Sequence, residues 1–223
     1  PVGPETARQG KPEARAETDV PERANSPTEV VLITGSSGFI GRALAARLKA
    51  RYRVIGLGLF TPPNSEVETI KLDLTKPAQI KEAMGEVAAK CGKRIASVIH
   101  LAAYYDLSGE PNPKYQQVTV EGTRQLLQAL HSRFTVEQFV FSSTLLVHAP
   151  GEQGKPIDED WPIQPKWPYP ESKAKTEQLV KQERGNIPAV ILRLAGVYND
   201  DGRAAFLAQQ ISPIYEQQPM SYL

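Results

Sequence analysis

The sequence predicts an α/β fold in which helices cover both faces of a doubly wound parallel sheet. Three observations support this prediction. Strand-like and helix-like segments alternate along the chain, the strand-like segments are short apolar runs, and a glycine-rich turn follows the first of them. Such alternation is typical of βαβ units, whose parallel strands are buried on both faces. In these sheets ligands bind at the carboxyl ends of the strands, so functional residues are expected there.

The first strand is expected at Val30–Thr34, an apolar run rich in β-branched residues. The helix after it is expected at 39–50, where Ile40, Leu44 and Leu48 recur with helical spacing. Further strands are expected at 52–59, 67–72, 96–101, 137–141 and 189–194, and further helices at 77–90, 113–133 and 169–184.

Two segments differ from this rhythm. Residues 1–28 are rich in Pro, Glu, Arg and Ala and poor in large apolar side chains, so they are expected to form a disordered tail. Residues 148–168 contain five prolines and two tryptophans and connect the fifth strand to the next helix. Long loops at a ligand-binding edge are usually functional, so this one is expected to lie on the substrate side.

Composition excludes several classes of protein. The formal net charge of the 223 residues is +1, which favours neither nucleic acid nor an anionic membrane as a partner. The single cysteine, Cys91, excludes a disulfide within the chain and argues against a cysteine metal site. No apolar run reaches the roughly 20 residues of a membrane helix. Low cysteine use favours a reducing, cytoplasmic location.

A glycine pattern between the first strand and the first helix indicates a dinucleotide-binding site. The turn needs a tight bend at Gly35, a close approach of the pyrophosphate at Gly38 and close packing of the helix on the strand at Gly41. The expected cofactor contacts in this segment are Gly35, Ser37, Gly38, Phe39, Ile40 and Gly41. A P-loop is excluded because Arg42, and not Lys, follows the last glycine.

The second strand lacks the acidic residue that commonly binds the adenosine ribose. Gly58 stands at the place where that carboxylate is expected. Without it, discrimination against a 2′-phosphate is weakened, so the choice between NAD and NADP stays open.

A candidate catalytic set follows the fifth strand. Tyr169 and Lys173 are four residues apart, so they share one face of the expected helix. An ammonium group beside a phenol favours the phenolate, so the pair predicts a lowered Tyr169 pKa and a general acid–base role. The hydroxyl of Thr144, at the end of the fifth strand, is placed to hydrogen-bond a substrate oxygen.

These motifs resemble those of the extended short-chain dehydrogenases/reductases, the NAD-dependent epimerase/dehydratase family. The resemblance extends over residues 30–199 and rests on the turn TGSSGFIG, on HLAA at 100–103, on VTVEGT at 118–123 and on the Tyr169–Lys173 pair. It implies that Thr144, Tyr169 and Lys173 are catalytic. It also implies further cofactor contacts at Asp73, Leu74, Leu101, Ala102, Ala103, Ser142, Tyr169 and Lys173.

The resemblance implies hydride transfer between a nicotinamide and a small-molecule substrate that carries a hydroxyl or carbonyl group. A nucleotide sugar, a sterol-like alcohol and a small ketone all suit this chemistry, as do dehydrogenation, epimerisation and dehydration. No metal is implied, and a homodimer is expected from the resemblance alone. His100 is interpreted as a core or strand-end histidine without an acid–base role.

Several positions depart from the family pattern. Thr119 replaces a usual Asn, Asn199 replaces a Gly, and His148 lies where Tyr is more common. Family members continue into a smaller substrate-binding region, whereas only residues 200–223 follow here, with an amphipathic helix expected at 203–215. The expected organisation is a tail at 1–28, a dinucleotide-binding catalytic domain at 29–199 and the start of a truncated substrate-binding region at 200–223. These departures keep open an alternative, a cofactor-binding sensor or structural protein without turnover.

Overall fold

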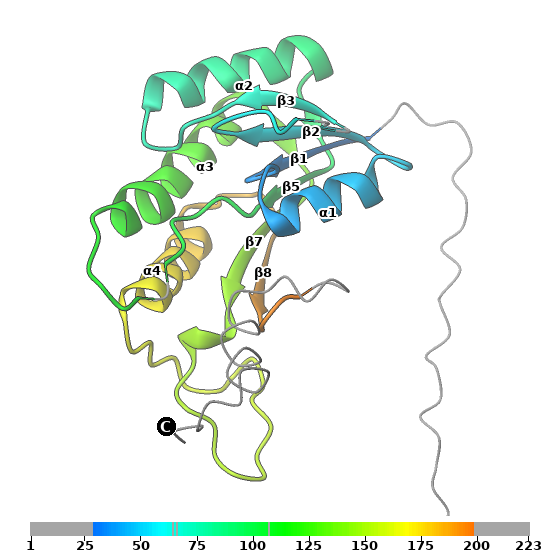
Figure 1. Cartoon of the computed structure of the whole chain (residues 1–223). Coiled ribbons are helices and arrows are strands. Elements are labelled where there is room, and N and C mark those ends of the chain that lie inside the picture. Colours follow the sequence, from blue (N-terminus) through cyan, green and yellow to red (C-terminus); the bar gives the residue numbers. More distant parts are fainter. Residues whose placement is uncertain (1–28, 64, 66, 107, 199–223) are drawn as a thin grey trace, which may run out of the picture.

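A computed structural model describes residues 29–63, 65, 67–106 and 108–198 (Figure 1). The expected tail at 1–28 and the expected helix at 203–215 lie outside these residues.

The core of the molecule is a six-stranded sheet in which every pair of neighbouring strands is parallel. The strand order is β3-β2-β1-β5-β7-β8. Their bounds are β1 (Val30–Thr34), β2 (Arg53–Gly58), β3 (Glu68–Lys71), β5 (Ser97–His100), β7 (Phe139–Thr144) and β8 (Ala189–Leu194). The chain runs outward from β1 to β3 and then crosses back to β5, so the direction of winding changes between β1 and β5. The predicted doubly wound parallel sheet is confirmed.

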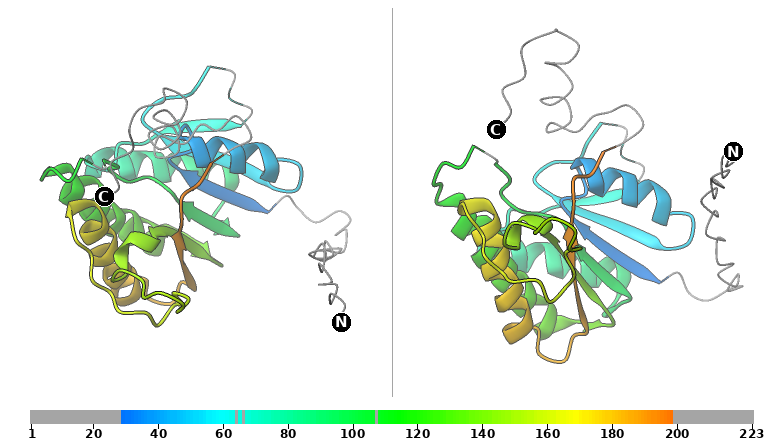
Figure 2. Two further views of the ribbon diagram at one scale, coloured as in Figure 1. Left: turned by 60° about the horizontal axis from the view of Figure 1, so that its bottom comes forward. Right: turned by 90° about the horizontal axis from the view of Figure 1, so that it is seen from below.

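Helices cover the two faces of the sheet unequally (Figures 1 and 2). Helix α1 (Phe39–Leu48) packs on one face, against a small cluster that contains Val31, Ile33 and Val54. The other face carries α2 (Pro77–Cys91), α3 (Gly122–Arg133) and α4 (Pro168–Glu183) over the larger cluster. Alternate residues of β1 divide between the two clusters because successive strand side chains point to opposite faces.

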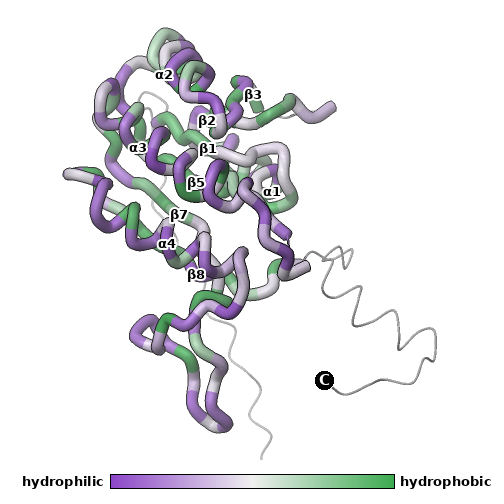
Figure 3. Tube along the Cα trace, turned by 90° about the vertical axis from the view of Figure 1, so that its left-hand side faces the viewer, coloured by the Kyte–Doolittle hydropathy of each residue, from purple (hydrophilic) through white to green (hydrophobic). Residues whose placement is uncertain are grey.

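The hydropathy of the chain follows this layering (Figure 3). The central strand β1 is buried along its whole length, whereas α4 alternates between buried and exposed residues. On the last strand, Val190 and Leu192 remain exposed among the described residues. Within the described part of the chain, no helix combines the length and the apolar character that crossing a membrane requires.

The expected helix at 113–133 is divided in two. It begins as a π-helix, η1 (Tyr115–Glu121), and continues as α3. Hydrophobic spacing does not distinguish i→i+5 from i→i+4 hydrogen bonding, so the sequence predicts only a helix here. Three further short elements were not predicted, namely the paired strands β4 (Arg94–Ile95) and β6 (Thr135–Val136) and the 3₁₀-helix η2 (Leu145–Val147).

Candidate active site

The glycine turn between β1 and α1 is tightly packed. Gly35 has a φ of +69°, which confirms the bend expected there. A Cβ atom at Gly41 would overlap the carbonyl oxygen of Gly35 and lie 2.7 Å from the Cα of Ser36. Gly41 therefore lets the helix pack against the turn itself, and not against a strand as the sequence suggested.

The start of α1 fits a pyrophosphate. Gly38 precedes the helix with extended backbone and no side chain to cap the first N–H groups, and the first turn has no acidic residue. Uncapped N–H groups at a helix N-terminus attract anions. The hydroxyl of Ser36 is buried and has no hydrogen-bond partner among the described residues. That hydroxyl lies against Gly56 of β2, inside the fold, so the uncapped helix start alone fits an anion from outside the chain.

A hydrogen-bond chain begins where β1 ends. The hydroxyl of Thr34 accepts from the backbone N–H groups of Leu101 and Ala102, both at 3.1 Å, and lies 2.7 Å from Nδ1 of His100. Nε2 of His100 lies 2.9 Å from the hydroxyl of Thr123, which itself donates to the carbonyl of Thr119. Because the Thr123 hydrogen is used there, Nε2–H of His100 donates to Thr123, and Thr34 donates to Nδ1.

His100 is thus a neutral, fully buried connector. Burial, followed by the nearby charge of Lys173, lowers the pKa of His100 to about 3. The interpretation of His100 as a core histidine is confirmed by its burial.

The chain of hydrogen bonds continues to α4, which carries Tyr169 and Lys173. The carbonyl of His100 accepts from the hydroxyl of Ser142 at 3.1 Å, and Nζ of Lys173 donates to the carbonyl of Ser142 at 2.7 Å. The same Nζ lies 4.8 Å from the centre of the Phe141 ring. Burial lowers the pKa of Lys173 to about 7, against the charge of Glu177, which raises it.

The environment of Tyr169 overturns one expectation. The Tyr169 side chain is buried and packs edge-on against the ring of Tyr105, with the two ring centres 5.1 Å apart. Burial, followed by the charges that Tyr105 and Tyr115 carry when ionised, raises the pKa of Tyr169 to about 12. The expected lowering by Lys173 is therefore wrong for the chain alone, because desolvation of the phenolate outweighs attraction to an ammonium that burial itself discourages.

Thr144 lies at the carboxyl end of β7 and is buried. Its hydroxyl accepts a hydrogen bond from the backbone N–H of Leu146 at 3.3 Å and so caps η2. Among the described residues its own hydrogen has no acceptor, so the O–H group can donate to another oxygen.

The remaining predicted cofactor contacts differ in their surroundings. Asp73 follows β3, and its carboxylate accepts from the backbone and hydroxyl of Thr75, which lower its pKa. Leu74 is buried and packs against Gly122, where a Cβ atom would lie 2.7 Å from that of Leu74. Ala103 continues the segment after β5 and is half-buried. Asp73 thus also stabilises a turn and Leu74 also packs in the core, whatever contact each makes with a cofactor.

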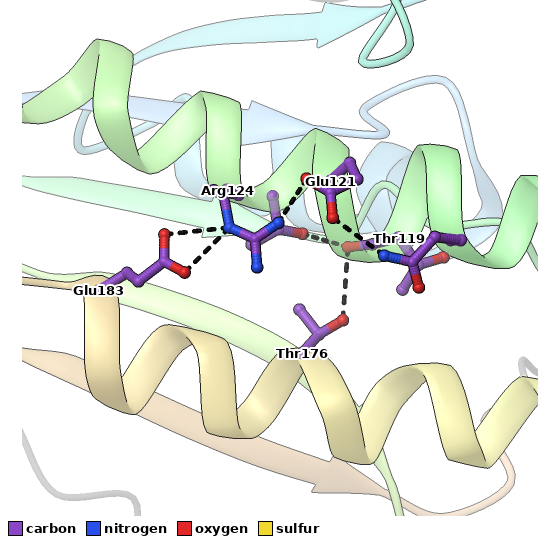
Figure 4. Close-up of polar contacts among 7 residues, drawn as sticks. Thr119, Glu121, Arg124, Thr176 and Glu183 are labelled. Atoms are coloured by element: carbon purple, nitrogen blue, oxygen red, sulfur yellow. Dashed lines mark hydrogen bonds and ion pairs between the residues drawn. The ribbon is translucent and has the colours of Figure 1, made fainter.

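The substituted position Thr119 lies in η1 and is fully buried. Its hydroxyl accepts from the backbone N–H of Tyr104 at 3.1 Å. Its carbonyl accepts from Thr123 and, at 3.4 Å, from Thr176 on α4, and Figure 4 shows Thr119 and Thr176 facing each other across the two helices. Thr119 therefore joins η1 to α4.

One group of residues near the site was missed by the sequence analysis. Ser143, His148, Glu177 and Arg193 are connected by hydrogen bonds and an ion pair. The available signal was the position of Glu177, four residues after Lys173 and hence on the same helical face. Its partners lie on other elements, and no spacing in the sequence indicates them.

A parallel sheet with this strand order and a glycine turn where the winding changes direction defines the Rossmann class of dinucleotide-binding folds.

Comparison with known proteins places the chain within that class. The chain belongs to the NAD dependent epimerase/dehydratase family, whose model matches residues 31–223.

Individual relatives have several activities. The 3 beta-hydroxysteroid dehydrogenase type 7 of Mus musculus is 32% identical over 205 residues, which cover 80% of this chain and 53% of the relative. The dTDP-D-glucose 4,6-dehydratase of Homo sapiens is 32% identical over 184 residues, 75% of this chain and 51% of the relative. A crystal structure of UDP-glucuronic acid 4-epimerase from Bacillus cereus in complex with NAD is similar with a TM-score of 0.67 and 27% identity, covering 85% of this chain and 64% of that one. The chain spans about half the length of these curated relatives.

Proposed function

We propose that this chain is the cofactor-binding and catalytic part of an NAD(P)-dependent enzyme that transfers hydride between a nicotinamide and a substrate carbon bearing a hydroxyl or carbonyl group. The observation that carries the proposal is the hydrogen-bond chain from Thr34 through His100 and Ser142 to Lys173. It connects the phosphate-binding turn to the catalytic helix along the carboxyl edge of β1, β5 and β7. One edge of the sheet thus carries groups for both ends of a dinucleotide.

The cofactor supplies or accepts the hydride when it is bound. The turn from Gly35 to Gly41 would hold the pyrophosphate, as its uncapped helix start favours. The contacts proposed to complete this site are Ser37, Phe39, Ile40, Asp73, Leu74, Leu101, Ala102, Ala103, Ser142, Tyr169 and Lys173.

The proposed proton chemistry follows from the protonation of the residues. With its pKa raised to about 12, Tyr169 is protonated at neutral pH and so can give a proton to a substrate oxygen that becomes an alkoxide. The hydroxyl of Thr144 donates a hydrogen bond to the same oxygen. Lys173, when protonated, stabilises negative charge on Tyr169 after the proton has left.

The proposed substrate is a small molecule such as a nucleotide sugar, a sterol-like alcohol or a small ketone. The named relatives support this range, since one is a hydroxysteroid dehydrogenase and another a sugar-nucleotide dehydratase. We further propose the division into a tail, a catalytic domain at 29–199 and a following substrate-binding region, a cytoplasmic location and a homodimer. The last is tested by light scattering at micromolar concentration.

The first experiment is a calorimetric titration of the folded chain with NADH and, separately, with NADPH. We expect saturable binding of at least one of them. The second is the Tyr169→Phe variant, which should keep cofactor binding but lower turnover by at least about 100-fold, because a proton donor is lost. Tyr52→Phe, beside α1, is the matched control and should change neither.

The alternative is a cofactor-binding protein without turnover. Gly58 in place of an acidic residue and the raised pKa of Tyr169 favour it. The two proposals separate in one assay, since saturable binding without conversion of a substrate from any of the three classes, by oxidation, reduction, epimerisation or dehydration, would support the alternative. Absence of binding in a folded chain would contradict both.

A further inference from the structure

A buried carboxylate lies next to the proposed catalytic residues. Glu177 follows Tyr169 and Lys173 at successive spacings of four residues, so the three share one face of α4. Only 3% of Glu177 is exposed. A carboxylate removed from water needs charged or hydrogen-bonding partners, because its desolvation is otherwise too costly.

Glu177 has two partners on different strands. Nη2 of Arg193, on β8, lies 2.8 Å from Oε2, and Nε of Arg193 lies 3.1 and 3.3 Å from the two carboxylate oxygens. The hydroxyl of Ser143, on β7, donates to Oε1. A forked arginine–carboxylate pair with an added hydroxyl donor is among the strong and directional polar contacts in proteins.

Arg193 extends this contact to the loop at 148–168. Its Nη1 donates to the carbonyl of Glu159 at 2.9 Å and to Nε2 of His148 at 3.1 Å. Since a guanidinium group only donates, Nε2 of His148 accepts, and Nδ1–H of His148 donates to the carbonyl of Trp161 at 2.9 Å.

The same loop is closed at its base by backbone hydrogen bonds. Ala149 N–H donates to the carbonyl of Pro162 at 2.8 Å, and Gln164 N–H donates to that of Val147 at 2.9 Å. Arg193 contacts both this loop, at His148 and Glu159, and Glu177 on α4, so it joins the loop to the helix.

This carboxylate lies near two proposed catalytic residues, since it bonds the neighbour of one and shares a helix with the other. Ser143 immediately precedes Thr144, and Lys173 lies one helical turn before Glu177. The charge of Glu177 raises the pKa of Lys173 against the effect of burial. The other titratable groups that face Lys173 are Tyr169, protonated on the same helix, and His100, neutral on β5.

We propose that Glu177 and Arg193 are a positioning pair, in which Glu177 favours the ammonium form of Lys173 and fixes the strand end that carries Thr144, while Arg193 fastens the 148–168 loop to the catalytic helix. The pair acts through other residues and is not itself catalytic. This inference rests on the proposed function, which assigns catalytic roles to Thr144 and Lys173.

The charge on Lys173 is the first test. In the full chain with ¹³C-labelled lysine, the Cε resonance of Lys173, assigned with Lys173→Met, is followed against pH by NMR. In Glu177→Gln we expect its titration midpoint to fall by about one pH unit, because the nearest negative charge is removed. An unchanged midpoint would overturn the role given to Glu177.

The matched control is Glu183→Gln on the same helix. Glu183 also pairs with an arginine, Arg124, but faces α3 (Figure 4). This variant should leave the Lys173 midpoint where it is in the wild type. An equal fall in both variants would show a general effect of helix charge and would contradict the proposal.

The attachment of the loop is tested by amide hydrogen exchange. In Arg193→Met the N–H groups of Ala149 and Gln164 should exchange at least about tenfold faster, since loosely held segments open more often. Glu183→Gln should leave these rates unchanged. Unaltered exchange in Arg193→Met would overturn the role given to Arg193.

Folding is checked by circular dichroism for every variant. If Arg193→Met does not fold, Arg193→Lys, which keeps the charge but loses the forked pair, replaces it and should still raise the exchange of the two loop amides. If Glu177→Gln does not fold, Glu177→Asp, whose shorter side chain moves the carboxylate, replaces it and should still lower the Lys173 midpoint; an unchanged midpoint would overturn the role given to Glu177. These readings need no turnover. A wild-type chain that binds neither NADH nor NADPH would therefore contradict the proposed function, whereas the midpoint and exchange data decide on the positioning pair.

Discussion

At the scale of single residues, the Thr34 hydroxyl connects the end of β1 to β5 by several hydrogen bonds. Its one hydroxyl accepts from two backbone N–H groups after β5 and donates to Nδ1 of His100. All of these groups are buried or half-buried. Without the hydroxyl, the Leu101 N–H keeps the Thr34 carbonyl at 3.3 Å, whereas the Ala102 N–H and Nδ1 of His100 lose a partner that water does not replace.

Replacing Thr34 with Val should therefore destabilise the fold more than the loss of one hydrogen bond suggests. Each buried polar group left unpaired costs about 1–3 kcal/mol, and we expect a loss of at least about 2 kcal/mol in the free energy of unfolding by urea. Thr135→Val, at an exposed threonine of β6, should change it by less than about 0.5 kcal/mol. Equal stability of the two variants would contradict the role given to Thr34.

Gly58 carries a prediction about cofactor choice. A Cβ atom there would lie 3.5 Å from the hydroxyl of Ser37, an ordinary contact, so a side chain fits. Gly58→Asp should increase the affinity for NADH relative to NADPH by at least about tenfold, because a carboxylate accepts from the ribose hydroxyls and repels a 2′-phosphate. Calorimetric titration measures both, and Gly58→Asn is the neutral control of similar size. The same ratio in both variants would place the ribose elsewhere.

Single residues also show where prediction from sequence ends. The bend at Gly35 and the neutral, buried His100 follow from local patterns. The raised pKa of Tyr169 does not follow from a local pattern. It depends on how far the fold buries the phenol and on Tyr105, which is 64 residues away in the sequence. The pairing of Glu177 with Arg193 is likewise a consequence of tertiary packing.

At the scale of elements, the strands and helices were largely predictable because their hydrophobic periodicity is strong. β1 and β8 have the bounds expected from the sequence, and α2 and α4 differ by a residue or so at their ends. The division into η1 and α3 was not predictable. It is accompanied by hydrogen bonds from Thr123 and Thr176 to the carbonyl of Thr119, and one of these donors lies on another helix.

The same substitution, glycine to alanine, should have opposite effects on stability at two helical positions, Gly41 and Gly85. Gly41→Ala forces α1 away from the turn, since its Cβ atom would overlap the Gly35 carbonyl, and should cost about 1–3 kcal/mol and weaken dinucleotide binding at least tenfold. Gly85→Ala in α2 should instead stabilise by about 0.5–1 kcal/mol, because its Cβ atom meets only the flexible end of Arg133, at 3.3 Å. Thermal unfolding and titration with the better-binding dinucleotide measure both. A stable Gly41→Ala variant with normal binding would show that the turn is not constrained as described.

At the scale of the whole molecule, the fold buries two basic side chains, His100 on β5 and Lys173 on α4. His100 and Lys173 are almost fully buried, and burial lowers both of their pKa values, to about 3 and about 7. The unfolded chain binds a proton at each group where the folded chain does not, so the free energy of unfolding should increase with pH in two windows. The first runs from about 3 to 6.5 for His100, and the second from about 7 to 10.5 for Lys173.

The upper window gives a test that involves the whole fold. Between pH 7 and 9, Lys173 alone should add up to about 1.4 kcal/mol per pH unit to the free energy of unfolding. Lys173→Met removes the titrating group, so its stability should be nearly independent of pH over this range and should exceed that of the wild type most clearly near pH 7, where the buried amine is partly charged. Urea unfolding at each pH provides the measurement.

The control is Lys181→Met, at an exposed lysine on the same helix, which should keep the slope of the wild type. If Lys173→Met keeps that slope as well, the amine is not held with a lowered pKa in the fold. Lys173 would then be a permanent ammonium group at neutral pH, and the contribution of Glu177 to its charge would be unnecessary. A slope lost only in Lys173→Met would instead show that stability is given up at this position to keep a titratable amine beside Tyr169.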